Sequence, residues 1–383
     1  MPNSYNILIV AGEPSGDMHG ALLVNEMKKI APDIKFWGFG GNKMAQQNVE
    51  IIVDVENLAV MGLIDVIRDF PRLNRYMREL VKIAVGEKPA GAILIDYPGF
   101  NLKLAKKLKA QNIPVGYYIS PQLWAWGEKR VNTIRKYVDK MVCILPFEKE
   151  FYNRHNIDVE YVGHPFVNIV KQELSRKQFM ERTGVRGEYI VVLPGSRKKE
   201  IVRLLPAMLK TYNLINAKVK NISAVIAASS GYENLIAKIC SKYSMSHIPI
   251  VENLTYSALS YAKAGIITSG SATLEALICE LPAVVIYRVD AITWAIGKKM
   301  IKSPHIALAN LVCGERVYPE FIQDFSSEQL ADAIIELIEP AHSESKRENM
   351  KKKLCKAKEK LGDGDAPKKA ATIFQNLFFG SKR

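Results

Sequence analysis

Short apolar runs alternate with segments of helical spacing along most of this chain. Six runs in the first half predict strands: Asn6–Ala11, Ile34–Gly38, Gly91–Ile95, Val115–Ile119, Lys140–Ile144 and Val159–Val162. Five more follow in the second half: Tyr189–Leu193, Ser223–Ala227, Ile248–Val251, Gly265–Thr268 and Ala283–Tyr287. Helical spacing marks intervening segments such as Gly20–Ile30, Leu102–Ala110, Glu128–Tyr137 and Leu274–Cys279. Such alternation predicts parallel sheets with helices on both faces, and two series in tandem predict two doubly wound α/β domains.

The boundary between these domains is predicted near Gly163-His164-Pro165, because glycine and proline end the sixth strand. The expected division is residues 1–165, residues 166–342 and a C-terminal part, 343–383. That last part is predicted to form two helices, at about Ser343–Lys360 and Pro367–Phe379. Two arrangements stay open: the helices extend the second domain, or they cross back onto the first.

Composition narrows the class of protein. A length of 383 residues suits two domains, and no apolar run approaches the roughly 20 residues that span a bilayer. The first residues lack the basic stretch of a secretory signal, so a cytosolic protein is expected. Five scattered cysteines, never spaced as CxxC, argue against a disulfide framework and against zinc.

The net charge of +14 indicates an anionic partner. Part of it lies in Lys346–Lys360, which holds eight basic and two acidic residues. This run is either a solvated amphipathic helix or a contact for a lipid surface. No nucleic-acid-binding motif is present, so nucleic acid is not expected as a partner.

One candidate anion site follows the strand Tyr189–Leu193. The sequence LPGSRKKEI, residues 193–201, combines Gly195 and Ser196 in a tight turn with the guanidinium of Arg197. A helix N-terminus attracts phosphate through its free N–H groups, and arginine matches phosphate oxygens. The plainer alternative makes Ser196 a helix cap and Arg197 a surface residue.

A second small-residue turn follows the strand Gly265–Thr268. It reads SGSATLEA, residues 269–276, with Ser269, Gly270, Ser271 and Thr273 at the expected start of a helix. If Ser271 caps that helix, a capping box would need its acid at position 274, which is leucine. Glu275 is therefore interpreted as an acceptor for ribose hydroxyls. Neither turn matches a P-loop, and no GxGxxG follows the first strand.

The first domain carries carboxylates at the corresponding places. Residues 10–17, VAGEPSGD, put Glu13 and Asp17 after the first strand, and IDYPGFN puts Asp96 after Gly91–Ile95. Two carboxylates would repel a diphosphate, but they accept hydrogen bonds from hydroxyls, and one can take a proton from an attacking hydroxyl. These three acids are expected to converge at one sheet edge. The nearby indoles of SPQLWAW are interpreted as either sugar contacts or core residues.

The segment 57–80 contains more apolar residues than a single helical stripe requires. The excess lies in Val60, Met61, Leu63, Ile64, Val66 and Ile67. The segment is either a core helix or an apolar surface for acyl chains or bilayer lipid, flanked by arginines. A few buried CH₂ groups and basic residues would hold a protein reversibly at a membrane.

Nine motifs in order resemble those of the lipid-A-disaccharide synthases, glycosyltransferase family 19: AGEPSGD, AVMGLIDV, IDYPGFN, SPQLWAW, GHP, LPGSRKKEI, SGSATLE, PAVVIYR and PEFIQ. The resemblance covers nearly the whole chain. It implies a GT-B fold, with two Rossmann-like domains facing across a cleft. It also implies an inverting, metal-independent transfer of 2,3-diacylglucosamine from UDP-2,3-diacylglucosamine to the 6-hydroxyl of 2,3-diacylglucosamine 1-phosphate, without a cofactor.

The resemblance also implies roles for single residues. Arg197 would bind the UDP phosphates, Glu275 the ribose, and Asp96 would be the general base beside Glu13. Asn310 and Gln323 would line the cleft. The chain departs from the family pattern at Ser271, where threonine is expected, and at Ala309, where proline is expected. His19 lies close enough in sequence to be an alternative base.

Two other classes of function stay open: another UDP-sugar GT-B enzyme, such as a lipid-linked N-acetylglucosaminyltransferase or a 2-epimerase, and a membrane-peripheral nucleotide-binding module without turnover. The apolar segment argues against the epimerase, whose substrate carries no acyl chains. The expected location is the cytoplasmic side of the inner membrane, on its anionic surface. The sequence leaves a homodimer open.

Overall fold

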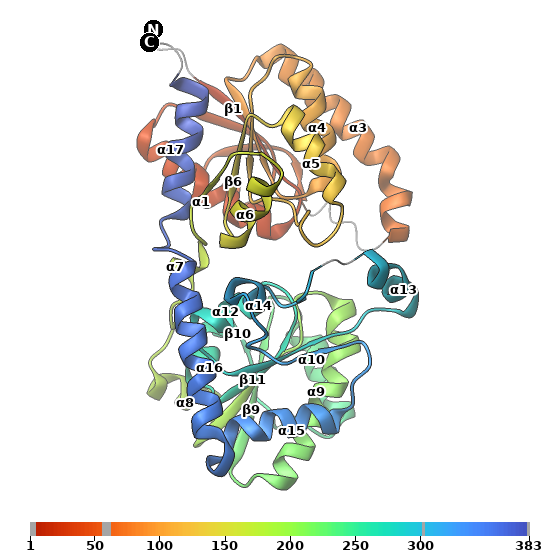
Figure 1. The fold of residues 1–383 in the computed structure, drawn as a ribbon, viewed down its shortest axis with the longest axis vertical. Coiled ribbons are helices and arrows are strands. Elements are labelled where there is room, and N and C mark those ends of the chain that lie inside the picture. Colours follow the sequence, from red (N-terminus) through yellow and green to blue (C-terminus); the bar gives the residue numbers. More distant parts are fainter. Residues whose placement is uncertain (1–4, 56–62, 301–302, 381–383) are drawn as a thin grey trace. The chain divides into compact units, whose positions relative to one another are not determined.

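The computed structural model describes residues 5–55, 63–300 and 303–380. The chain forms two compact units, each around its own parallel sheet (Figure 1). The first unit contains Met1–Pro165 together with Gly362–Arg383, and the second contains Phe166–Leu361.

The first unit has a seven-stranded parallel sheet in the order β3-β2-β1-β4-β5-β6-β7. Its strands are β1 Asn6–Ala11, β2 Lys35–Gly40, β3 Val49–Asp54, β4 Gly91–Ile95, β5 Val115–Tyr118, β6 Lys140–Cys143 and β7 Val159–Tyr161. Its helical segments are α1 Pro14–Ile30, α2 Asn42–Ala45, α3 Leu63–Glu87, α4 Pro98–Lys109, η2 Glu128–Arg130, α5 Val131–Tyr137, α6 Pro146–Arg154 and α17 Ala366–Phe379. The central strands are apolar and buried because helices cover both faces.

The last helix, α17, packs beside α1 on the first unit. Its rings lie directly on the sheet at two glycines. A Cβ atom at Gly91 would lie 2.1 Å from the ring of Phe378, and one at Gly116 would lie 2.5 Å from the ring of Phe374. These glycines therefore let a helix from the far end of the chain complete the core of the first unit.

The second unit repeats the topology with six parallel strands in the order β10-β9-β8-β11-β12-β13. The strands are β8 Glu188–Leu193, β9 Ile222–Ala228, β10 Ile250–Glu252, β11 Ala264–Thr268, β12 Ala283–Tyr287 and β13 Glu320–Ile322. The helices are α7 Phe166–Ile169, α8 Arg176–Thr183, α9 Lys198–Lys218, α10 Glu233–Lys242, α11 Thr255–Tyr261, α12 Ala272–Ile278, α13 Ala291–Met300, α14 Leu308–Cys313, α15 Ser327–Ile338 and α16 Pro340–Lys360.

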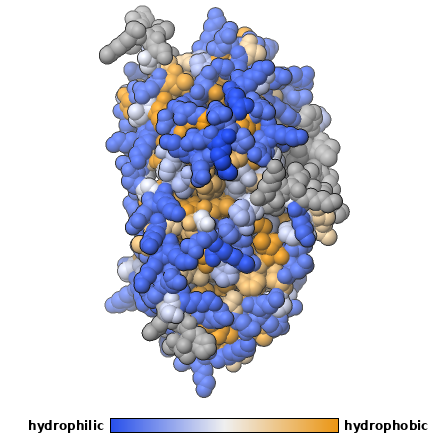
Figure 2. Space-filling model, viewed as in Figure 1, coloured by the Kyte–Doolittle hydropathy of each residue, from blue (hydrophilic) through white to orange (hydrophobic). Residues whose placement is uncertain are grey.

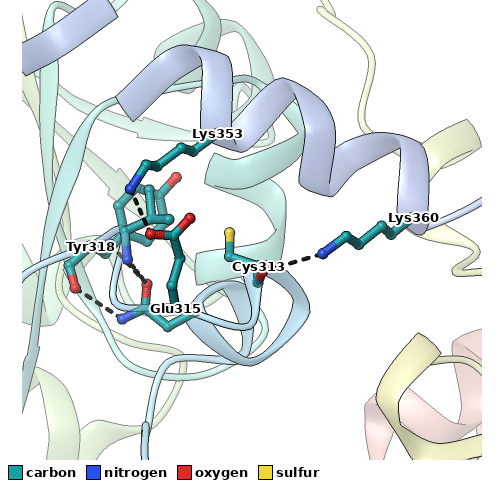
Figure 3. A network of polar contacts seen from close by, with 7 residues as sticks. Cys313, Glu315, Tyr318, Lys353 and Lys360 are labelled. Carbon is teal, nitrogen blue, oxygen red and sulfur yellow. Dashed lines mark hydrogen bonds and ion pairs between the residues drawn. The ribbon is translucent and has the colours of Figure 1, made fainter. Parts of the chain in front are cut away.

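Part of the basic run in α16 ties that helix to its own unit. Lys353 pairs with Glu315 at 2.5 Å, and Lys360 donates to the carbonyl of Cys313 at 3.2 Å (Figure 3). Lys358 pairs with Glu280 at 2.9 Å. These lysines stabilise the packing of α16 on α12 and α14, so they contribute less to any free basic surface than the sequence suggests.

All eleven predicted strands are present, with ends shifted by a few residues, and the structure adds two that the pattern did not reveal. Both are edge strands: β3 pairs only with β2, and β13 only with β12. Most of the side chains in these two strands are half-buried or exposed, so neither strand shows a long apolar run. The helix predicted in 57–80 is α3, which runs through Pro71, whereas 57–62 lies outside the described residues.

Hydrophilic side chains cover most of the face drawn in Figure 2, with apolar side chains in smaller areas between them. Within the described part of the chain, no helix combines the length and apolar character that crossing a membrane requires.

Candidate functional site

The predicted turns follow the pair of strands at which each sheet reverses its order. In the first unit the reversal lies between β1 and β4, which pair in parallel with Ala11 opposite Ile95. In the second it lies between β8 and β11, where Leu193 is opposite Ile267. Open α/β sheets bind ligands outside the carboxyl ends of their strands at such points. Each unit therefore carries a candidate site of its own, with Glu13 and Asp96 in the first and the two small-residue turns in the second.

The backbone of Asp96 is held in an unusual conformation. Asp96 and Tyr97 have φ values of 43° and 48°, in the left-handed region that side chains other than glycine rarely adopt. Several hydrogen bonds hold this turn. Tyr117 donates its hydroxyl to the Asp96 carbonyl at 2.5 Å, and the Asn101 amide donates to the same carbonyl at 2.9 Å. Such strain persists only where surrounding structure fixes it, and it concentrates at functional sites.

Gly12 makes room for this turn. A Cβ atom at Gly12 would lie 2.2 Å from Cδ1 of Tyr97, so any larger residue would displace the ring. The glycine in the motif AGEPSGD therefore allows the turn after β1 to pack closely against the turn after β4.

The side chain of Asp96 is poised to exchange a proton near neutral pH. Burial raises its pKa to about 7, the negative charge of Glu13 adds to the rise, and the Tyr97 N–H acts in the opposite direction. Glu13 itself is exposed at the N-cap of α1, where its side chain makes no capping hydrogen bond. A general base works best when its pKa lies near the working pH.

Asp17 has a different role from the one expected. Its buried carboxylate accepts hydrogen bonds from the backbone N–H groups of Gly41, Lys43 and Met44, at 2.7 to 3.0 Å. These groups form the N-terminus of α2. Asp17 was expected to converge with Glu13 and Asp96 at one sheet edge, and in the structure its carboxylate anchors the turn after β2.

His19 is buried as well, but its chemistry differs from that of Asp96. Burial lowers its pKa to about 4, with a further contribution from the charge of Lys43. His164 of the Gly-His-Pro motif is also buried, and burial followed by the charge of His19 lowers its pKa to about 3. Both imidazoles are therefore neutral at pH 7. A base of such low pKa accepts a proton poorly, which favours Asp96 over His19.

The sequence did not single out Glu148, a buried carboxyl whose pKa also responds to the charge of Asp96. It is the third residue of α6, only 1% exposed, and accepts the Leu145 N–H at 3.1 Å. Burial raises its pKa to about 8; the Leu145 N–H and the Trp124 side chain lower it, and the charge of Asp96 raises it further. Glu148 is therefore a neutral acid at pH 7. Its place after strand β6 was the available signal, but PFEKEF resembles an ordinary helix start.

In the second unit, Gly195, Ser196 and Arg197 form the turn that leads from β8 into α9. Gly195 has a φ of +113°, and Arg197 is the N-cap of the helix, with a side chain that is 59% exposed. Ser196 donates its N–H to Glu200 at 3.2 Å, and Arg197 donates from Nη1 to the other carboxylate oxygen at 3.0 Å. The donors predicted for phosphate thus converge on one carboxylate.

The turn after β11 contains two residues whose side chains are hydrogen-bonded to backbone and two residues that are exposed. Ser269 donates to the Ile306 carbonyl at 3.2 Å, and buried Thr273 donates to the Gly270 carbonyl at 2.8 Å. Gly270 has a φ of +152° with open space where a Cβ would stand, and the Ser271 side chain makes no capping hydrogen bond. Thr273 and Ser269 therefore shape the turn, whereas Gly270 and Ser271 face its open side.

Glu275 lies in the first turns of α12, half-buried. Burial raises its pKa to about 7. As expected from the sequence, it does not complete a capping box, since the N-cap is Ser271 and Glu275 is the fourth residue of the helix.

Asn310 and Gln323 both bind backbone within the second unit. Asn310 is fully buried; its Oδ1 accepts the N–H groups of Val317 and Tyr318, and its Nδ2 donates to Glu320 at 2.9 Å. Gln323 exchanges two hydrogen bonds with the backbone of Val289, each 3.1 Å long. In the structure these amides position the loops after β12 and before β13.

The side chains predicted to contact acyl chains lie outside the described part of the structure. Val60 and Met61 lie outside the described residues. Leu63, Ile64, Val66 and Ile67 belong to the first turns of α3, where only the backbone is described.

The raised pKa of Asp96 predicts a pH-dependent cost in stability. The folded protein holds this proton up to about pH 7, whereas the unfolded chain loses it near pH 4. The stability that the neutral form contributes is therefore complete below about pH 4 and is lost as pH rises through 7. Asp96→Asn mimics the neutral form. In urea denaturation at pH 8, its free energy of unfolding should exceed that of wild type by about 1–3 kcal/mol, and at pH 4 the two proteins should be nearly equal in stability.

Tryptophan fluorescence suits this measurement, since Trp37, Trp124 and Trp126 lie in the first unit and only Trp294 in the second. Asp33→Asn, at an exposed position before β2, is the matched control and should change little at either pH. Equal stability of Asp96→Asn and wild type at pH 8 would contradict the burial of an ionised carboxylate.

Solved structures of low sequence identity share the fold. The UDP-GlcNAc 2-epimerase from Neisseria meningitidis, bound to UDP-GlcNAc, matches with a TM-score of 0.65 at 13% identity, over 97% of this chain and 100% of that one. The co-structure of S. aureus MnaA with UDP matches with a TM-score of 0.67 at 12% identity, over 99% of each chain. These similarities confirm the predicted GT-B class of two doubly wound α/β units.

Comparisons of the sequence identify the family more specifically than the fold does. The model of the lipid-A-disaccharide synthetase family matches residues 7–374. The lipid-A-disaccharide synthase of Myxococcus xanthus is 38% identical over 376 residues, 97% of each chain. That of Syntrophus aciditrophicus is 38% identical over 379 residues, 98% of each chain, and that of Coxiella burnetii (strain CbuG_Q212) 34% over 380 residues, 98% of this chain and all of the other. The chain therefore belongs to the lipid-A-disaccharide synthase family.

Proposed function

We propose that the chain transfers 2,3-diacylglucosamine from UDP-2,3-diacylglucosamine to the 6-hydroxyl of 2,3-diacylglucosamine 1-phosphate, producing the lipid A disaccharide 1-phosphate and UDP. Membership of the lipid-A-disaccharide synthase family supports this reaction. The observation that carries the mechanism is the constrained carboxyl of Asp96, whose pKa of about 7 suits a general base.

In this proposal Asp96 acts on the acceptor. Its carboxylate takes the proton of the 6-hydroxyl while the hydroxyl oxygen attacks the anomeric carbon of the donor. The bond from that carbon to the diphosphate breaks, its electron pair leaves with UDP, and the single displacement inverts the anomeric centre. Glu13 keeps the pKa of Asp96 high, and His19 stays neutral at pH 7.

The second unit would hold the donor. Arg197 and the Ser196 N–H are the groups proposed for the diphosphate, together with the turn of Ser269, Gly270 and Ser271. Cationic and N–H donors of this kind stabilise the charge that develops on a leaving diphosphate. Glu275 would accept hydrogen bonds from the ribose hydroxyls. Gly195 and Thr273 shape the two turns, and Asn310 and Gln323 fix the loops beside them.

The direct test is formation of disaccharide from the two substrates, compared between wild type, Asp96→Asn and Asp33→Asn. Loss of the base should reduce kcat by about a hundredfold or more while UDP still binds, because the donor groups belong to the second unit. Asp33→Asn should behave as wild type.

Three results would contradict the proposal. Full activity of Asp96→Asn would remove Asp96 as the base, and donor consumption without disaccharide would point to a different UDP-sugar enzyme. Binding of UDP without turnover by wild type would leave only a nucleotide-binding module.

We further propose that the first unit contacts the anionic cytoplasmic surface of the inner membrane. Exposed basic side chains lie on two neighbouring helices, α3 and α4: Arg75, Arg78, Lys82, Lys103, Lys106 and Lys107. Glu79, also exposed, offsets part of this charge. Each basic residue near such a surface contributes about 1 kcal/mol, and the apolar residues predicted at Val60–Ile67 would add to it.

Sedimentation with lipid vesicles tests this contact. Replacing Lys103, Lys106 and Lys107 by glutamine should weaken binding to vesicles containing anionic lipid by about tenfold or more, with little effect on zwitterionic vesicles. The matched control replaces Lys220, Lys238 and Lys242, exposed lysines of the second unit, and loses the same charge. Equal weakening by both triple variants would show that net charge alone, rather than this surface, governs binding.

A further inference from the structure

The start of α9 already holds an anion that belongs to the chain. Glu200, the third residue of the helix, accepts the Ser196 N–H through Oε2 at 3.2 Å and Nη1 of Arg197 through Oε1 at 3.0 Å. The Glu200 side chain is 19% exposed, whereas that of Arg197 is 59% exposed. One carboxylate therefore accepts from both donors of this turn that the proposed function assigns to the diphosphate.

The turn is shaped around this carboxylate. A Cβ atom at Gly195 would lie 2.6 Å from Oε2 and 2.8 Å from the Cβ of Glu200, and Gly195 has a φ of +113°. A larger residue at position 195 would therefore collide with Glu200 as well as strain the backbone. Gly195 thus provides both the backbone conformation and the space that Glu200 needs.

A carboxylate and a phosphate compete for the same donors, because both are anions that accept charge-assisted hydrogen bonds. We propose that Glu200 occupies the diphosphate cradle when no nucleotide is present and is displaced when the nucleoside diphosphate binds. This inference rests on the proposed function of the cradle. Glu200 keeps the Ser196 N–H and Arg197 oriented in the free protein, and its charge weakens the hold on UDP, which favours release of that product.

The alternative is a purely local role. A carboxylate in the first turn stabilises a helix through its N-terminal N–H groups and dipole. The two roles predict different changes in UDP affinity when the charge of Glu200 is removed. A local role predicts that removing the charge leaves UDP affinity unchanged or lowers it by disordering the turn. Displacement predicts that removing the charge raises the affinity, because the competing anion and its repulsion are gone.

Calorimetric titration of the full chain with UDP distinguishes these roles. Glu200→Gln keeps the shape of the side chain and removes its charge, and Glu200→Ala removes both. The matched control is Glu188→Gln, which removes a carboxylate at the opposite end of the same strand, β8. We expect Glu200→Gln and Glu200→Ala to bind UDP about fivefold more tightly than wild type, and Glu188→Gln to bind as wild type does.

Uridine, which carries no phosphate, is the second probe, and its affinity should be the same in all four proteins. Thermal melting shows whether each variant is folded. The inference is overturned if folded Glu200→Gln and Glu200→Ala bind UDP no more tightly than wild type, or if uridine gains as much as UDP. Failure of wild type itself to bind UDP would instead overturn the proposed donor site, and the inference with it.

Discussion

The reversal of strand order within each parallel sheet is the constraint on which the proposed chemistry depends. Where two neighbouring strands lead into helices on opposite faces, the carboxyl edge stays open between them. In the first unit this opening adjoins Glu13 and Asp96, and in the second it adjoins Arg197 and Ser271. The turns at this edge carry carboxylates in the first unit, and in the second they carry the arginine and serine residues proposed to bind the diphosphate.

The turn at Asp96 shows how the fold maintains an unfavourable state. Its left-handed backbone and its half-buried carboxyl both cost free energy, and hydrogen bonds from surrounding groups hold the backbone in place. Tyr117 and Asn101 bind the Asp96 carbonyl, while Tyr97 packs over Gly12. A residue tuned in this way trades stability for reactivity, as is common at functional sites.

Much of this arrangement could be predicted because strand ends are visible in the sequence. Asp96 directly follows a continuous apolar run, and Arg197 stands in the short turn after another, so the pattern alone predicts their places at the sheet edges. Asp17 lies in the first turn of the helix after β1, yet its partners are N–H groups 24 to 27 residues away, which no local pattern reveals. Glu148 was missed because the start of α6 resembles an ordinary helix N-terminus, and the sequence does not show that this first-turn carboxyl is buried.

The pH dependence of kcat/KM for disaccharide formation, compared between wild type and Glu13→Gln, tests the central claim most directly. If Asp96 is the base and Glu13 raises its pKa, activity in wild type rises with pH through a midpoint near 7, and this midpoint moves to lower pH in Glu13→Gln. Glu50→Gln, at an exposed position of β3, should leave the midpoint in place. An unchanged midpoint in Glu13→Gln would contradict the account, because it would show that the titrating group does not sense the charge of Glu13.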